Sequence, residues 1–141
     1  MVNFLQINLR QSPAAYDLAC QNAATLIPHS NVLLISETPV PAARVATTNA
    51  VGNRTSIIVH NPSIAYRVLP PTENTCAIEL ENLVVVSVYI TPISSRLEYS
   101  AFLDELHQVM TSAPGRRFVI AGDFNAHHST WHDGNSDRKG N

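Results

Sequence analysis

Residues 118–128 read Phe118-Val119-Ile120-Ala121-Gly122-Asp123-Phe124-Asn125-Ala126-His127-His128. Their apolar beginning predicts a buried strand, which ends at an aspartate and an asparagine placed two positions apart. Because side chains at i and i+2 of a strand lie on the same face, we expect the Asp123 carboxylate and the Asn125 amide to point together. Gly122 lets the backbone approach a neighbouring group closely. An acceptor beside an amide donor suits the handling of a water and a phosphate, so we expect the chemistry of the chain here.

The N-terminal part of the sequence alternates between strand and helix patterns. Residues 4–9 predict a strand. Ser12 and Pro13 are a favourable N-cap and first residue for the helix that we expect to continue to Ile27. The uninterrupted apolar run 32–35 predicts a strand buried on both faces.

The middle of the chain has a different character, with short β-branched segments separated by turn residues. Residues 39–54 are rich in Ala, Thr, Asn and Gly and predict a loop. The segments that follow are typical of an antiparallel meander. They cover residues 55–60, 65–69, 76–80 and 83–90.

From Ser95 the apolar period becomes helical. One stripe is formed by Tyr99, Phe102, Leu103, Leu106, Val109 and Met110. Pro114 and Gly115 end this helix, and residues 117–121 form the next strand. Helices interleaved with strands and a meander predict a layered α/β domain.

The composition predicts one intracellular domain. The chain has 141 residues, of which 45% are hydrophobic and 14% are charged, and its net charge of −2 gives no bulk attraction to nucleic acid. No apolar run approaches the roughly 20 residues of a membrane span, and we find no signal peptide. Cys20 and Cys76 match no metal or disulfide spacing, which favours reduced, buried thiols.

Four places at strand ends carry polar residues that could form a site. Glu37 follows a buried run and could bind Mg²⁺ or Mn²⁺, although a carboxylate at a strand end is more often a surface group. Asn8 could simply end its strand, and Tyr89 could be a core residue with a satisfied hydroxyl. The pair Asp123 and Asn125 is the strongest signal, because a buried strand rarely ends in two polar residues without a use.

Three histidines follow this pair, at positions 127, 128 and 132. Their spacing matches no closed zinc site. They could form a partly exposed loop. Alternatively, His127 could lie beside Asp123 and orient it or contact phosphate as an accessory group.

The motifs in this order resemble the endonuclease/exonuclease/phosphatase superfamily. More narrowly, they resemble the apurinic-endonuclease-like domain that opens the polyprotein of non-LTR retrotransposons in arthropods. The run Gly-Asp-Phe-Asn-Ala-His-His-x-x-Trp, followed by Asp-Arg-Lys-Gly, is typical of that branch. The motifs span residues 5–9, 35–39, 87–92, 122–131 and 137–140.

The resemblance implies a fold, a reaction and a set of site residues. It implies an α/β sandwich of two packed mixed sheets flanked by helices, in a domain that nicks target DNA to prime reverse transcription. Asn8 and Glu37 would hold Mg²⁺ or Mn²⁺, and Tyr89 would position the scissile phosphate. Asp123 would orient or deprotonate the attacking water, and Asn125 would contact the phosphate. DNA is the implied partner, with a downstream reverse transcriptase domain and a nuclear location.

The resemblance also implies that residues 1–141 are the N-terminal two-thirds, roughly, of a single such domain. A strand as apolar as 118–121 is expected to lie centrally, yet residues 128–141 contain no aliphatic side chain. The family's later Ser-Asp-His segment has no counterpart in the motif order. The alternatives are therefore an inactive remnant of that domain, or a phosphatase of the same superfamily.

Overall fold

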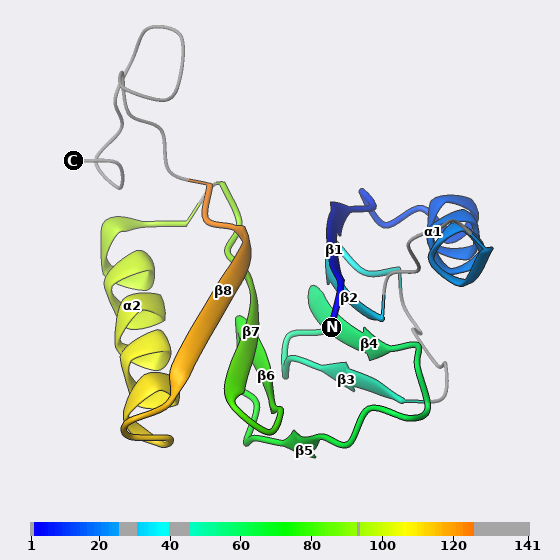
Figure 1. The fold of residues 1–141 in the computed structure, drawn as a ribbon. Coiled ribbons are helices and arrows are strands. Elements are labelled where there is room, and N and C mark those ends of the chain that lie inside the picture. Colours follow the sequence, from blue (N-terminus) through cyan, green and yellow to red (C-terminus); the bar gives the residue numbers. More distant parts are fainter. Residues whose placement is uncertain (1, 26–30, 40–45, 93, 126–141) are drawn as a thin grey trace, which may run out of the picture.

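The computed structural model describes residues 2–25, 31–39, 46–92 and 94–125 of the chain. In these ranges the chain forms two four-stranded sheets and two helices (Figure 1). The first sheet contains, in spatial order, β1 (Phe4–Asn8), β2 (Val32–Ser36), β4 (Thr55–Val59) and β3 (Thr47–Asn49). The second contains β5 (Arg67–Val68), β6 (Thr75–Glu79), β7 (Leu83–Tyr89) and β8 (Arg117–Asp123). The helices are α1 (Pro13–Thr25) and α2 (Arg96–Thr111).

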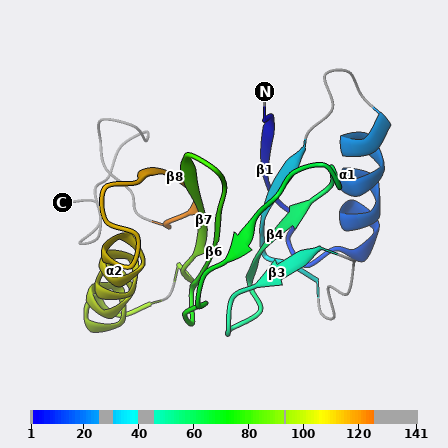
Figure 2. The same ribbon diagram turned by 60° about the horizontal axis from the view of Figure 1, so that its bottom comes forward.

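The two sheets pack face to face, and each helix covers the outer face of one sheet (Figures 1 and 2). Three apolar clusters fill the spaces between these layers. One lies between the sheets and includes Leu34, Ile57 and Val85. The second joins β7 to α2, and the third joins the first sheet to α1. The predicted layered sandwich of two sheets flanked by helices is confirmed.

Both sheets are mixed, as predicted, and their strand directions gather several strand ends at one edge. The first sheet pairs β1 with β2 in parallel and β2 with β4 in antiparallel fashion. In the second sheet β6 and β7 are antiparallel, whereas β7 and β8 are parallel. The carboxyl ends of β1, β2, β7 and β8 and the amino end of β4 therefore lie together.

Each helix begins as its sequence predicts. The Ser12 hydroxyl accepts a hydrogen bond from the Ala15 backbone N–H at 3.2 Å, and α1 begins at Pro13. The predicted end of this helix beyond Ile27 lies outside the described residues. At α2, the Ser95 hydroxyl accepts the Glu98 backbone N–H at 3.1 Å and donates to the Glu98 carboxylate at 3.2 Å, so one backbone donor of the first turn is satisfied.

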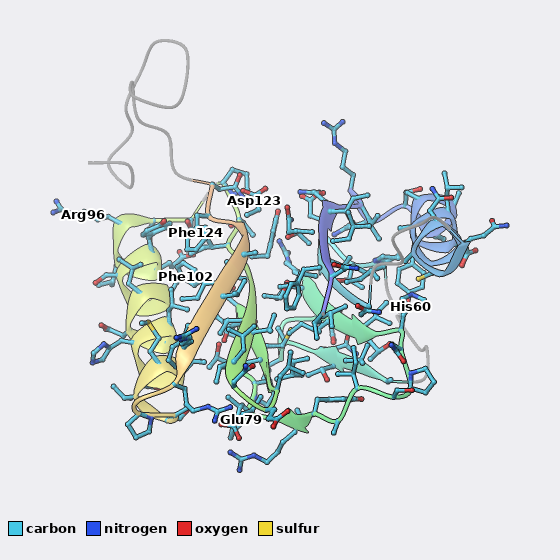
Figure 3. All side chains as sticks on the ribbon, in the orientation of Figure 1. His60, Glu79, Arg96, Phe102, Asp123 and Phe124 are labelled. Carbon is cyan, nitrogen blue, oxygen red and sulfur yellow. The ribbon has the colours of Figure 1, made fainter. Side chains whose placement is uncertain are left out.

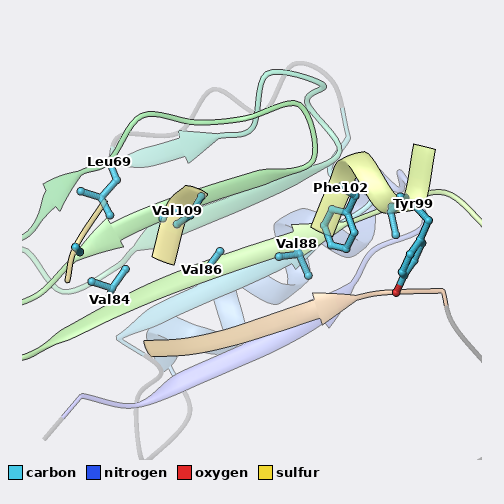
Figure 4. Close-up of a cluster of buried hydrophobic side chains, with 10 residues drawn as sticks. Leu69, Val84, Val86, Val88, Tyr99, Phe102 and Val109 are labelled. Atoms are coloured by element: carbon cyan, nitrogen blue, oxygen red, sulfur yellow. The ribbon is translucent and has the colours of Figure 1, made fainter. Parts of the chain in front are cut away.

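The apolar stripe of α2 is narrower than predicted. Tyr99, Phe102 and Val109 are buried against β7 (Figure 4). Leu103 and Met110 keep 47% and 40% of their surface exposed. Their positions lie at the border of the buried face, where periodicity alone does not separate contact from solvent.

Two details of the predicted architecture are wrong. The expected loop 39–54 contains β3, which pairs with β4. The strand at 55–60 belongs to the first sheet, so only β5, β6 and β7 form a meander in the second. Within the described residues, β8 pairs with β7 alone and lies at the sheet edge. Its side chains are half-buried because β1 of the other sheet lies next to it.

Candidate active site

The sequence-predicted residues meet at the edge where the strand ends gather. Asn8 ends β1, Tyr89 ends β7 and Asp123 ends β8, and Tyr89 is in register with Asp123. Asn8 is in register with Ser36, so Glu37 lies one position beyond it on β2. Figure 3 places Asp123 at this end of the second sheet and Glu79 at the opposite end. Strand direction thus brings residues from four separate segments into one place.

A hydrogen bond between Tyr89 and Glu37 links the two sheets. The Tyr89 hydroxyl donates to Oε1 of Glu37 at 2.8 Å. Burial first, and then the hydrogen bond and the negative charge of Glu37, raise the pKa of Tyr89 from 10.0 to about 12. Asp123 acts in the same direction, while the positive charge of Arg54 acts against it. Tyr89 is therefore a neutral hydrogen-bond donor at neutral pH.

A second contact between the sheets joins Asn8 to Asp123. The Asn8 side-chain Nδ2 donates to Oδ2 of Asp123 at 3.4 Å. The amide oxygen of Asn8 accepts the backbone N–H of Arg10 at 2.9 Å. Both ends of this amide are thus oriented, and Asn8 holds a fixed position beside the Asp123 carboxylate.

Asp123 and Asn125 lie close together, but strand alternation is not the reason. β8 ends at Asp123, and Asn125 has a left-handed backbone with a φ of 45°. The backbone N–H of Asn125 donates to Oδ1 of Asp123 at 3.0 Å, and its side-chain amide donates to the Ile90 carbonyl oxygen at 2.6 Å. A turn closed by the aspartate side chain therefore replaces the expected extended pair.

Gly122 is required by the neighbouring strand. Its φ is 144°, and a Cβ atom there would overlap the carbonyl oxygen of Val88 and lie 2.9 Å from the Val88 N and C atoms. The close approach predicted from the sequence is real, and the group approached is the backbone of β7. Gly122 thereby sets the distance between Asp123 and the end of β7.

Buried hydroxyl groups support the site from between the sheets. Thr55 Oγ1 and Ser87 Oγ lie 2.6 Å apart, and both residues are fully buried. Thr55 donates its single hydroxyl hydrogen to the Ile35 carbonyl oxygen at 3.0 Å, so Ser87 is the donor to Thr55. Nearby, the Thr38 and Ser56 hydroxyls are 3.0 Å apart. These bonds fix β4 against β2 and β7 directly below Glu37 and Tyr89.

The donor set fits a hard divalent cation. In the described residues, no group of three or more His, Cys, Asp or Glu side chains could hold a metal ion. The available oxygens are those of the Asn8 amide and of the Glu37 and Asp123 carboxylates. Oε1 of Glu37 already accepts from Tyr89, which leaves Oε2 for a ligand. Mg²⁺ commonly binds through one or two carboxylates with waters and substrate oxygens completing its shell.

A cleft of about 350 Å³ adjoins this cluster. It is lined by Arg54 and Asn74, by Ile90 and Thr91 just after the end of β7, and by Glu105 of α2. Sequence reasoning did not single out Arg54. In the sequence, Arg54 is marked only by its position directly before a strand. That position places it near Glu37 only because β4 runs antiparallel to β2.

One sequence-predicted accessory group cannot be placed. His127 lies outside the described residues, as do His128 and His132. None of the helices in the described part of the chain has the length and apolar character needed to cross a membrane.

Comparisons with known proteins agree with the fold described above. Residues 83–141 match a protein family described as endonuclease-reverse transcriptase. The endonuclease domain of TRAS1, a telomere-specific non-LTR retrotransposon, is similar with a TM-score of 0.78 and 22% identity, covering 99% of this chain and 67% of that one. TDP2 of D. rerio, humanized by 14 mutations, is similar with a TM-score of 0.58 and 14% identity, covering 91% and 64%. The search of curated proteins finds no match. The chain has the fold of the TRAS1 endonuclease domain, and residues 83–141 match the kind of family that the order of the motifs predicts.

Proposed function

We propose that this chain is a divalent-metal-dependent endonuclease domain that nicks DNA so that a reverse transcriptase can extend the exposed end. The observation that carries the proposal is the convergence of Asn8, Glu37, Tyr89, Asp123 and Asn125 at one edge of the sandwich. Amide, carboxylate and phenol groups from both sheets surround one point there. The match of residues 83–141 to an endonuclease-reverse transcriptase family supports the same reaction class.

The residues divide the work of phosphodiester hydrolysis in a simple way. The Asp123 carboxylate orients a water molecule and accepts its proton as the water oxygen bonds to phosphorus. The bond from phosphorus to the 3′ oxygen breaks, and that oxygen takes a proton from solvent water to become the hydroxyl that a polymerase can extend. The Asn125 amide and the Tyr89 hydroxyl donate to the phosphoryl oxygens as negative charge develops on them. Asn8 and Glu37 would hold the divalent cation, which would supply positive charge to the phosphoryl and leaving oxygens.

Tyr89 and Glu37 cooperate in this scheme through their hydrogen bond. The bond holds one oxygen of the Glu37 carboxylate in place and leaves the other for a ligand. Because its hydroxyl remains protonated, Tyr89 can transfer this donor to a phosphate oxygen when the substrate arrives. The proposed partner is DNA, the implied cellular site is the nucleus, and a reverse transcriptase domain would act on the product.

The test is relaxation of supercoiled plasmid by the purified chain with Mg²⁺, with Mn²⁺ and with EDTA. We expect nicking only with metal, and we expect Asp123→Asn to lower the rate by about 10²–10⁴-fold because a general base is lost. Asp104→Asn is the matched control, since Asp104 is exposed on α2. A 5′-phosphorylated oligonucleotide distinguishes a phosphatase, which would release inorganic phosphate without cutting the chain. Metal-independent nicking, or full activity of Asp123→Asn, would contradict the proposal.

A further inference from the structure

Arg54 lies at the rim of the candidate active site because of strand direction. β4 begins at Thr55, which is in antiparallel register with Ser36, the last residue of β2. Arg54 therefore lies across from Glu37. Its carbonyl oxygen accepts the backbone N–H of Thr38 at 3.3 Å, which ties this rim to the loop that carries Glu37.

Arg54 also belongs to the lining of the cleft that continues from the site. Arg54 is exposed, and it lines the cleft together with Ile90 and Thr91. Ile90 is the residue whose carbonyl oxygen accepts the Asn125 amide, so the cleft begins where the proposed phosphate contacts end. The guanidinium is close enough to Tyr89 to oppose the effect of Glu37 and Asp123 on its hydroxyl.

Arg54 can offset the negative charges of the candidate active site. Glu37 and Asp123 place two carboxylates where a phosphodiester must bind, and like charges repel. Arg67 and Arg116 cannot offset them, because both pair with Glu79 at the opposite end of the sheet (Figure 3). Arg10 is exposed near Asn8 but does not line the cleft.

Three carboxylates, those of Glu73, Glu98 and Glu105, line the cleft together with Arg54. Glu105 accepts hydrogen bonds from Thr72 and Asn74, at 3.2 Å and 3.4 Å. Glu98 accepts from Ser95 at the start of α2. Among the described residues that line the cleft, Arg54 is the only one with a positive charge, so an anion that enters the cleft can form an ion pair only with its guanidinium.

We propose that Arg54 is a positioning residue that binds a DNA phosphate neighbouring the scissile one, an inference that rests on the proposed endonuclease function. The planar guanidinium presents paired N–H donors that match two phosphate oxygens. A phosphate held there fixes the strand across the end of the sandwich and aligns the scissile bond with Asp123. Such a contact is independent of base sequence and depends strongly on salt.

Binding and cleavage are measured separately to test this. Fluorescence anisotropy with a labelled DNA duplex, in EDTA, gives Kd at several salt concentrations for the wild type, Arg54→Gln and Arg54→Lys. Arg117→Gln is the control, because Arg117 is exposed at the start of β8, roughly 20 Å along the strand from Asp123. Thermal unfolding establishes that each variant is folded.

We expect Arg54→Gln to weaken binding equally for different DNA sequences and to lower the slope of log Kd against log salt by about 1. Arg54→Lys retains the slope, because the charge remains. In the nicking assay Arg54→Gln raises KM more than it lowers kcat. A slope equal to that of the wild type, a loss matched by Arg117→Gln, or no DNA binding by the wild type would overturn the inference.

The two proposals fail separately in this design. If Arg54→Gln lowers the slope while no variant nicks DNA, the phosphate contact stands and the endonuclease proposal fails. If nicking requires metal and Asp123 but Arg54→Gln leaves binding, slope and KM unchanged, the endonuclease proposal stands and Arg54 has no role in positioning.

Discussion

The side-chain amide of Asn125 donates a hydrogen bond of 2.6 Å to the carbonyl oxygen of Ile90. This bond connects the turn after β8 to the segment after β7, and it uses one of the two hydrogens on the Asn125 amide. The other hydrogen is available to a ligand. Asn125 is thus oriented by the protein and can still serve as a donor to phosphate.

Replacing Asn125 separates its backbone role from its amide role. Asn125→Gly keeps the left-handed backbone but loses the amide, whereas Asn125→Ala loses both. We expect both variants to lose nicking by about 10²–10³-fold, as when an oxyanion donor is removed. Urea unfolding should show Asn125→Ala to be less stable than Asn125→Gly by about 1 kcal/mol. Retained nicking in Asn125→Gly would assign the residue to the turn alone.

Removing the Tyr89 hydroxyl frees the Glu37 carboxylate. We expect Tyr89→Phe to reduce nicking by about 10–100-fold and to raise the metal concentration needed for half-maximal rate, as for other groups that orient a metal ligand. A metal titration of the plasmid assay measures both effects. Tyr66→Phe is the control, because Tyr66 is partly buried and precedes β5 at the opposite end of the second sheet. This variant should leave the nicking rate and the metal requirement unchanged. An unchanged metal requirement in Tyr89→Phe would rule out the orienting role.

Gly122 and Gly115 form a matched pair for backbone strain. Both have positive φ, but a Cβ at Gly115 would meet nothing within 4 Å, whereas one at Gly122 would overlap β7. Gly115→Ala should cost about 1–2 kcal/mol and leave nicking intact. Gly122→Ala should add an overpacking cost of about 1–3 kcal/mol and abolish nicking. Equal stability losses in chemical denaturation would mean that contact with Val88 is unimportant.

The hydroxyl pair of Thr55 and Ser87 should contribute to stability as a unit. Both hydroxyls are fully buried, so removing one of them deprives the other of a hydrogen bond that water cannot replace. A double-mutant cycle with Thr55→Val and Ser87→Ala, followed by urea unfolding, should give a coupling free energy of about 1 kcal/mol. Purely additive losses would show that the two hydroxyls do not interact.

The buried thiol of Cys76 makes stability depend on alkaline pH. Burial raises the pKa of Cys76 from 9.0 to about 12. The folded state thus retains the proton that the unfolded state releases, so this contribution is complete below pH 9 and is lost between pH 9 and about 12. Urea midpoints should fall across this window, and less steeply in Cys76→Ala. Rapid reaction of native Cys76 with a thiol reagent at pH 8 would contradict its burial.

Most of the architecture follows from local patterns. The N-cap at Ser12 and the uninterrupted apolar run of β2 are signals that the chain carries within a few residues. The membership of a strand in one sheet or the other has no such signal: β3 and β4 look like loop and meander until they are paired. That choice depends on tertiary packing, which a short β-branched segment does not encode by itself.

In the candidate site, too, some residues could be predicted from local sequence and others depend on tertiary packing. Asn8, Glu37, Tyr89 and Asp123 were predictable because each follows an apolar strand, and because their motifs occur in a familiar order. The turn at Asn125 was not, since the aspartate side chain closes it and no periodicity indicates that. Arg54 was missed because its proximity to Glu37 depends on an antiparallel pairing between segments far apart in the sequence.

The close contact of Gly122 with Val88 also limits which mutations of its codon this strand end can accept. Every nucleotide change at the first or second position of a glycine codon replaces the glycine, and each replacement would force β8 away from β7. The residue at position 122 therefore indicates, from sequence alone, whether a related chain can still assemble this strand end.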